Sequence, residues 1–260
     1  MSIIAPKYQY LTEVARSARA SGFGNSTIED KAITGRDVTV LGRKLINFGS
    51  CSYLGLELDP RVKEEAIRAV ERYGAEFSTS RSYLSLPLSD ELEELLSEVF
   101  GHPTIVAATT TLAHQSAIPL SIAGEDAVIL DKQVHTSVRT AVKLVKAEGT
   151  HVEVIPHNDL DMLAQRAAEL GKTHPQVWFM IAGIYSMYGD FAPIRELIAM
   201  LDANPQLHVY VDDAHAMAWT GFHGQGHALQ CGPLHPRMLV STSLAQGYGV
   251  CGCAIVCNVA

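Results

Sequence analysis

The sequence has no apolar run that could cross a membrane. Hydrophobic residues make up 47% of the chain, but polar residues interrupt them before the roughly 18 consecutive apolar positions of a membrane helix are reached. The N-terminal residues MSIIAPKYQY lack the basic start and small-residue end of a secretion signal. These absences predict a cytoplasmic protein that has no membrane partner.

Positive charge is also scarce. The chain has 20 lysines and arginines against 28 aspartates and glutamates, which gives a formal net charge of −8. General nucleic-acid binders need clustered basic side chains to replace the counterions at phosphates, and here the basic residues are scattered. The composition therefore excludes nucleic acid as a general partner.

Cysteine is too sparse to form a framework. The five cysteines cannot all pair, and their spacing fits neither a secreted disulfide scaffold nor a zinc site. Cys251, Cys253 and Cys257 fall on the same face of an expected strand as Ile255. We therefore expect small buried core residues there and no metal site.

From residue 104 onward the sequence alternates between apolar strands and helical segments. Such alternation is typical of a mostly parallel sheet with helices on both faces, which is an α/β fold. Strands are expected at 104–108, 127–130, 151–155, 176–182, 207–211, 238–242 and 253–257, and helices at 112–122, 137–148, 160–170 and 193–203.

The first third of the chain is more mixed. Residues 1–32 suggest a helical arm of the kind that crosses dimer interfaces, and residues 37–48 read as a hairpin that turns at Gly42. We divide the chain into an N-terminal arm and hairpin, residues 1–58, and a large domain, residues 59–260.

Two helices are expected at the start of that large domain. Asp59 and Pro60 have the pattern of an N-cap followed by a first-turn proline, and Gly74 ends the helix that they begin. Ser89 is expected to cap the second helix, which carries a stripe of leucines.

Two motifs follow neighbouring strands near the end of the chain. The segment Tyr210-Val-Asp-Asp-Ala-His215 brings two carboxylates and an imidazole to the C-terminal end of a buried strand, where open α/β sheets place their ligands. The segment Ser243-Leu-Ala-Gln-Gly-Tyr-Gly249 follows the next strand as a loop of small residues. Together the two motifs predict a ligand site.

With these motifs the chain resembles the α-oxoamine synthase family. Its members are fold-type I pyridoxal 5'-phosphate (PLP) enzymes that condense an amino acid with an acyl thioester and release carbon dioxide. In the family the fourth residue of the second motif is the lysine that binds PLP as a Schiff base, and here it is Gln246. Because an amide cannot form an imine, the resemblance implies non-covalent PLP and absent or impaired catalysis. The missing lysine also removes the base that would abstract the α-proton.

The resemblance assigns roles around the cofactor ring. Asp212 matches the aspartate that pairs with the pyridine nitrogen, and His215 matches the partner of the phenolic oxygen. His135 matches the imidazole that stacks on the ring, and Ser186 matches a serine that approaches the phenolic side. His135, His215 and Gln246 thus stand at the family's catalytic positions.

The resemblance also locates the phosphate. A helix N-terminus attracts anions, and Thr110 and Thr111 lie at the turn where the family has a glycine and an aromatic residue. Ser243 matches a hydroxyl residue that contacts the phosphate. Cys51 and Ala216 also replace usual family residues, which favours natural divergence over a single deliberate change.

The resemblance runs from residue 37 to residue 260. Family members continue into a smaller C-terminal domain that supplies an arginine for the substrate carboxylate, so we expect that domain to be missing here. Because the family builds each site at a subunit interface, a homodimer or a heterodimer is expected.

Other functions compete with an acyltransferase. The nearest alternative is a catalytically dead partner subunit of a lysine-bearing homologue. A nicotinamide-dependent oxidoreductase is distant, because no Gly-x-Gly-x-x-Gly follows an early strand. A metal hydrolase built on Asp212, Asp213 and His215 is a further alternative, although the neighbouring residues match the PLP pattern.

Overall fold

The computed structural model describes residues 9–22, 24 and 26–258, which fall into two compact units, 1–51 and 52–260. The first eight residues of the expected arm, and Phe23 and Asn25 in the polar stretch after it, lie outside the described residues.

The first unit contains one helix and one hairpin. The helix is α1 (Gln9–Ala20), and the hairpin pairs β1 (Asp37–Val40) with β2 (Arg43–Ile46) in antiparallel register. Leu41 and Gly42 form the turn with φ of 51° and 68°, the left-handed values that tight hairpin turns need. The expected hairpin and its turn at Gly42 are confirmed.

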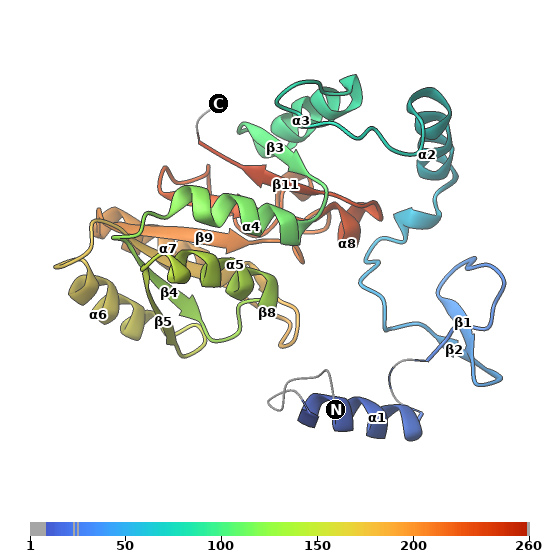
Figure 1. Cartoon of the computed structure of the whole chain (residues 1–260), viewed down its shortest axis with the longest axis horizontal. Helices are drawn as coiled ribbons and strands as arrows, with labels where there is room; N and C mark the ends of the chain where they lie inside the picture. The colour runs from blue at the N-terminus through green and yellow to red at the C-terminus, as the bar shows by residue number, and fades with distance from the viewer. Residues whose placement is uncertain (1–8, 23, 25, 259–260) are drawn as a thin grey trace. The chain divides into compact units, whose positions relative to one another are not determined.

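The second unit is built on one seven-stranded sheet (Figure 1). The strand order is β3-β11-β10-β9-β6-β4-β5, and only β11 runs antiparallel to its neighbours. The strands are β3 (Thr104–Ala107), β4 (Ala127–Asp131), β5 (His151–Ile155), β6 (Val177–Ala182), β9 (Leu207–Asp212), β10 (Met238–Ser241) and β11 (Cys253–Val256). The expected mostly parallel α/β fold is confirmed.

Helices cover both faces of this sheet because its central strands are buried on both sides. Along β6, Val177, Phe179 and Ile181 pack into one core, while Trp178 and Met180 pack into the other. The first core includes side chains of α3 (Pro87–Phe100), α6 (Leu160–Leu170) and α7 (Ile194–Ala203), and the second includes side chains of α4 (Thr110–Ser121) and α5 (Thr136–Ala147).

The two helices before the sheet differ in how well the sequence located them. In α2 (Pro60–Tyr73) the Asp59 side chain caps the Arg61 amide at 2.8 Å and Gly74 follows the last residue, as expected. The expected cap at Ser89 is wrong, because α3 begins earlier, at Pro87, after Leu86. Proline suits the first helical position, since its fixed φ is already helical and its missing N–H would have no partner there.

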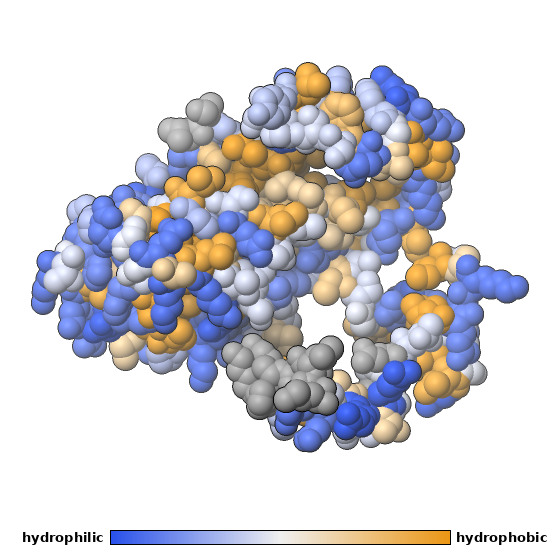
Figure 2. Space-filling view, in the orientation of Figure 1, coloured by the Kyte–Doolittle hydropathy of each residue, from blue (hydrophilic) through white to orange (hydrophobic). Residues whose placement is uncertain are grey.

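Apolar side chains of α2 and α3 remain at the surface. Ile67, Val70 and Leu95 are more than half exposed, and α2 has no buried residue at all. Orange patches over this part of the chain show the same feature in the space-filling view (Figure 2). An apolar groove of about 1000 Å³ runs between the two helices, with Val250 in its wall.

Two predictions about the end of the chain need revision, and one element earlier in the chain was not predicted. Cys253 is fully buried in β11 as expected, but Cys251 is exposed and lies before the strand begins, because Gly252 with φ 145° breaks the extended run. The residues after Ser243 form a short helix, α8 (Leu244–Tyr248), rather than a loop. A small hairpin, β7 (Ile184–Tyr185) with β8 (Asp190–Phe191), also escaped the sequence analysis.

Two absences hold for the part of the chain that the structure describes. Within it, no helix combines the length and the apolar character that a bilayer crossing demands. Among the same residues, histidine, cysteine and acidic side chains form no group of three that could hold a metal ion.

Candidate cofactor site

Asp212 is the buried carboxylate of the site. It ends β9 at the C-terminal edge of the sheet, opposite Ala182 of β6 and Ser241 of β10. Its side chain is almost fully buried, and Oδ1 accepts a hydrogen bond of 3.3 Å from the Ala214 amide. The strand register thus places one acidic group where neighbouring strands end together.

The buried His114 contacts the Asp212 carboxylate, and the sequence analysis missed this residue. It lies inside α4, fully buried, with Nε2 3.3 Å from Oδ2 of Asp212. The signal that could have found it is a titratable residue on the apolar side of a helix, one position from Ala113 and three from Ala117. Burial would raise the pKa of Asp212, but the close polar contact and charge of His114 and the hydrogen bond from the Ala214 amide lower it on balance. Asp212 is therefore ionised.

His215 faces the site from the segment that follows Asp212. Its Nδ1 forms a hydrogen bond of 2.6 Å with the Tyr53 hydroxyl, and its backbone carbonyl accepts from the Trp219 indole at 2.8 Å. Burial lowers the pKa of His215 more than the Asp212 charge raises it. The imidazole is therefore oriented on one side by Tyr53 and tends toward the neutral form that can accept a hydrogen bond.

His135 stands at the beginning of a helix. It is the N-cap of α5, and its Nδ1 lies 3.3 Å from the Ser137 amide and 2.6 Å from the Ser137 hydroxyl. The ring is fixed by the cap and still lines the pocket described below. Ser137 lines the same pocket beside His135, and the sequence analysis did not single it out.

The expected phosphate region is the N-terminus of α4. Thr109 is the N-cap, and its hydroxyl accepts from the Leu112 amide at 3.2 Å. The Thr110 hydroxyl donates to the Thr242 carbonyl at 3.2 Å, so its hydrogen is already engaged. Thr111 is exposed beside it. First-turn amides with no helical partner suit an anion.

The second motif closes the opposite wall. Ser243 caps α8 by accepting from the Ala245 amide at 3.1 Å, and it is 2% exposed. Gln246 follows on α8, and its Oε1 is buried without a hydrogen-bond partner among the described residues. Gly247 allows close packing, because a Cβ there would lie 2.6 Å from the Met217 carbonyl oxygen. An unpaired buried amide oxygen carries a free-energy cost that a bound ligand could relieve.

One pocket of about 270 Å³ collects nearly all of these groups. Its lining includes seven of the eight residues that the sequence singled out, namely Thr110, Thr111, His135, Asp212, His215, Ser243 and Gln246. The remaining one, Ser186, lines an adjoining pocket of about 250 Å³ together with His135, Asp212 and His215. The two pockets share those three side chains and form one cleft at the edge of the sheet.

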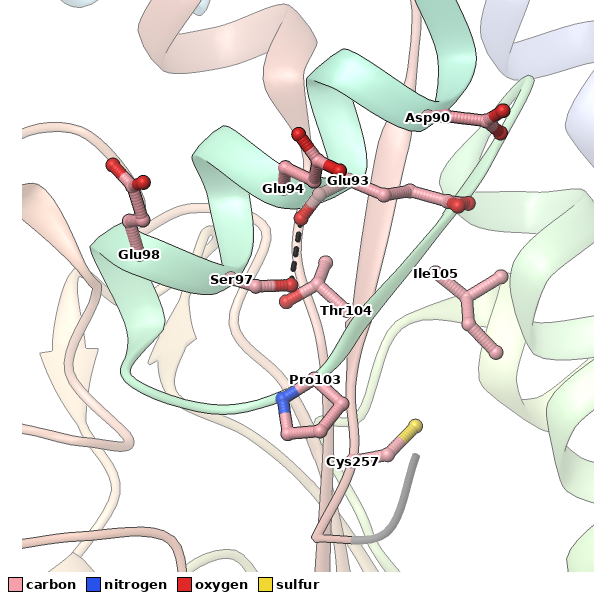
Figure 3. Close-up of a pocket in the computed structure, with 9 residues that line it drawn as sticks. All are labelled: Asp90, Glu93, Glu94, Ser97, Glu98, Pro103, Thr104, Ile105 and Cys257. Carbon is pink, nitrogen blue, oxygen red and sulfur yellow. Dashed lines mark hydrogen bonds between the residues drawn. The ribbon is translucent and has the colours of Figure 1, made fainter.

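A larger hollow lies elsewhere and has the wrong charge for a phosphate. It has a volume of about 780 Å³ between α3 and β3, and Figure 3 shows Asp90, Glu94 and Glu98 along its helical wall. The neighbouring Glu93 forms an ion pair with Arg81 and accepts a hydrogen bond from the Val106 amide. Clustered carboxylates repel a phosphorylated ligand, so this hollow does not suit a phosphate.

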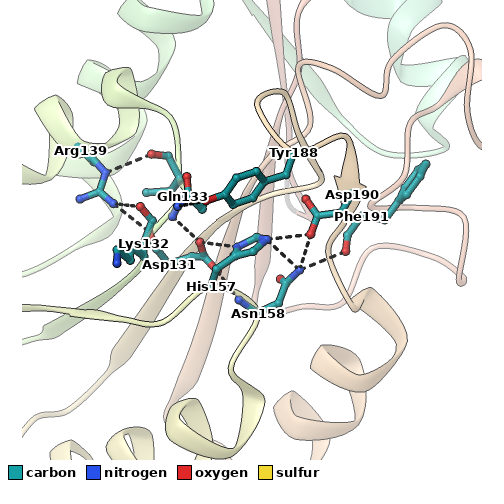
Figure 4. Close-up of polar contacts among 10 residues, drawn as sticks. Asp131, Lys132, Gln133, Arg139, His157, Asn158, Tyr188, Asp190 and Phe191 are labelled. Carbon is teal, nitrogen blue, oxygen red and sulfur yellow. Dashed lines mark hydrogen bonds and ion pairs between the residues drawn. The ribbon is translucent and has the colours of Figure 1, made fainter.

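A polar network supports the β7–β8 hairpin, whose turn contains Ser186. Figure 4 shows the network together with Tyr188, Asp190 and Phe191 of the hairpin. His157 lies between two carboxylates, with Nδ1 3.0 Å from Asp131 and Nε2 2.8 Å from Asp190. Asn158 also donates to Asp190 at 3.2 Å. Burial opposes protonation of His157, but the hydrogen bonds to both aspartates outweigh it and raise the pKa. Asp190 thus braces the β7–β8 hairpin.

The residues present fit a phosphorylated pyridine cofactor. The cleft offers an ionised carboxylate in Asp212, a fixed imidazole in His135, and α4 amides and the Ser243 hydroxyl for an anion. The unpaired Oε1 of Gln246 lies in the same lining. The chain is thus an α/β protein with a cleft whose residues suit such a cofactor.

The chain belongs to the aminotransferase class I and II family, which matches residues 43–260. It is 32% identical over 238 residues to an 8-amino-7-oxononanoate synthase of Maricaulis maris, an alignment that spans 89% of this chain and 60% of that protein. It is 35% identical to a serine palmitoyltransferase of Bacteriovorax stolpii over 73% of this chain and 44% of the relative. The expected resemblance to α-oxoamine synthases is confirmed by relatives of both kinds.

Solved structures agree with this assignment. A serine palmitoyltransferase variant from S. paucimobilis with a bound PLP–myriocin aldimine superposes with a TM-score of 0.85 at 26% identity, covering 97% of this chain and 63% of that one. A serine palmitoyltransferase with PLP as its internal aldimine gives the same score, identity and coverage. The expected fold-type I architecture is confirmed, and the chain spans less than two thirds of the relatives it matches.

Proposed function

We propose that this chain is the cofactor-binding part of an α-oxoamine synthase-like protein and that it holds PLP without a covalent bond. The observation that carries the proposal is the single pocket in which Asp212, His135 and Gln246 meet the N-terminus of α4. The names of the relatives support an amino acid and an acyl thioester as the substrates.

When bound, PLP supplies an electron-accepting ring that stabilises charge at the α-carbon of an amino acid. Asp212, held ionised, would keep a proton on the pyridine nitrogen, and the His135 imidazole would hold the ring. His215 and Ser186 would hold the phenolic oxygen from the adjoining pocket. The α4 amides at Thr110 and Thr111 and the Ser243 hydroxyl would hold the phosphate.

Gln246 determines what this site cannot do. Its amide is neither a nucleophile toward an aldehyde nor a base at neutral pH, so the chain lacks both functions of the family lysine. We infer that it is inactive or impaired by itself. The alternative is a catalytically dead subunit that completes a lysine-bearing homologue, and the replacement at residue 246 favours it directly.

A dimer follows from either version. The apolar side chains of α2 and α3 are exposed in a single copy, which is a feature of surfaces that become covered. Sedimentation equilibrium distinguishes the versions, because self-association supports a homodimer, and association only with a lysine-bearing homologue supports the partner role. A stable monomer that does not associate with the homologue would contradict both the homodimer and the heterodimer.

Binding of PLP tests the function itself. An absorbance titration should give saturable binding, and borohydride reduction followed by peptide mapping should show no pyridoxyl adduct at residue 246. An adduct on Lys132, which lines the adjoining pocket, would show that the anchor has moved. The matched control is Glu94→Gln in the acidic hollow, which should bind like the parent. Absence of saturable binding by the parent would contradict the proposal.

A further inference from the structure

A buried histidine lies beneath the cofactor pocket without lining it. His114 has no exposed surface, and it belongs to the middle of α4. Its Nδ1 lies 2.8 Å from the Tyr210 hydroxyl and 3.4 Å from the Ser241 hydroxyl. Its Nε2 lies 3.3 Å from Asp212 Oδ2 and has no well-aligned hydrogen bond, so the contact is a close polar one. Three buried polar groups on two neighbouring strands, β9 and β10, therefore converge on one imidazole.

The partners of Nδ1 determine the tautomer. Burial raises the pKa of Tyr210 well above its usual value, so the phenol keeps its proton. If the imidazole is neutral and Nδ1 accepts from the Tyr210 hydroxyl, the ring proton is on Nε2, toward Asp212. If the imidazole is charged, Nε2 carries a proton as well. In both states His114 presents an N–H to the carboxylate.

Asp212 has few other groups to hold it. Among the described residues its one backbone donor is the Ala214 amide, at a long 3.3 Å. A buried carboxylate without a partner takes up a proton, because low dielectric disfavours the charged form. A neutral Asp212 could not stabilise a positively charged pyridine nitrogen.

We propose that His114 is a positioning residue of the cofactor site, which fixes the Asp212 carboxylate and keeps it ionised. The proposal rests on the proposed function, since the aspartate matters in this way only if a pyridine ring binds. His114 touches neither cofactor nor substrate and acts through Asp212. The titratable groups that face Asp212 are His114, His135, Asp213, His215, Tyr210 and Cys253.

Two substitutions separate donor loss from volume loss. His114→Gln keeps an amide N–H close to the position of Nε2, whereas His114→Leu fills the space without a donor. Loss of this close polar contact with a charged carboxylate should weaken PLP binding by about 10- to 150-fold in His114→Leu at neutral pH. His114→Gln should stay within about fivefold of the parent. The deficit of His114→Leu should shrink as the pH rises, because a carboxyl with a raised pKa ionises there.

A measurement without cofactor tests the contact alone. In protein labelled with ¹⁵N at histidine, the His114 imidazole signals should shift when Asp212 is changed to Asn, in a variant that retains His114. Unchanged signals would overturn the proposal, as would a His114→Leu protein that binds PLP like the parent across the pH range. If the parent binds no PLP, the proposed function fails, and the imidazole signals alone decide whether His114 contacts an ionised Asp212.

Discussion

The His157 imidazole and the Asp131 carboxylate face each other at 3.0 Å, and Asp131 is fully buried. With Asp190 on the other ring nitrogen, the pair joins the end of β4 to the β7–β8 hairpin. The raised pKa of His157 means that the folded state binds this proton more tightly than the unfolded state. The stabilisation is therefore complete below the unfolded pKa and is lost as the pH rises through the folded value.

We accordingly expect the free energy of unfolding of the parent to decrease as the pH rises from about 6.5 to alkaline values. The decrease should be smaller in His157→Gln, which has no imidazole to titrate. The variant should be less stable than the parent at pH 6 by roughly 1–3 kcal/mol, because it loses charged hydrogen bonds. Urea unfolding at pH 6 and pH 9 measures both. Parallel pH curves for the two proteins would show that the network has no role in stability.

A second prediction concerns Asp213. Burial raises the pKa of its carboxyl to about 7, and Oδ1 has no hydrogen-bond partner among the described residues. Because the folded state holds the proton between about pH 4 and pH 7, stability should decrease as the pH rises through that window. Asp213→Asn should remove this decrease and stabilise the protein at pH 8 by an amount on the order of a few kcal/mol.

The matched control is Asp161→Asn, which removes an exposed carboxylate from the first turn of α6. It should leave the pH dependence unchanged. The account of Asp213 fails if both variants follow the parent, or if Asp213→Asn is less stable than the parent at pH 8.

A third prediction concerns the pyridine partner. Asp212→Asn keeps the shape of the side chain and removes its charge, so PLP affinity should drop by about 10- to 150-fold. Equilibrium dialysis against PLP gives the affinity, and Ser186→Ala provides a comparison at the opposite side of the ring, with a smaller expected loss. Equal affinity of Asp212→Asn and the parent would place the cofactor elsewhere.

The sequence located the site better than it located the groups that support it. Asp212, His215 and His135 each follow a strand end, so topology alone brings them together. His114 was missed because it lies within a helix whose neighbours read as apolar core. The network of His157, Asp131 and Asp190 joins three segments far apart in the chain, and no local pattern encodes such contacts.

Helix and strand boundaries were found where a backbone constraint marks them. Asp59, Pro60 and Gly74 define α2 through cap and backbone chemistry. The predicted start of α3 at Ser89 was wrong because serine, a common N-cap residue, also occurs within the first turn of helices. The observed helix begins at Pro87. Cys251 misled because strand alternation was extended past Gly252, whose positive φ ends it.

The central claim is that a PLP site remains here and lacks only its covalent anchor. Gln246→Lys tests it, with Gln246→Met as a control of similar length without an amine. The end of residue 246 already lies buried in the pocket, and a lysine desolvated there has a lowered pKa that makes it a better nucleophile. We predict that Gln246→Lys binds PLP more tightly than the parent and gives a borohydride-reducible adduct at residue 246, while Gln246→Met does not. Binding of Gln246→Lys no tighter than the parent, with no adduct, would contradict the account.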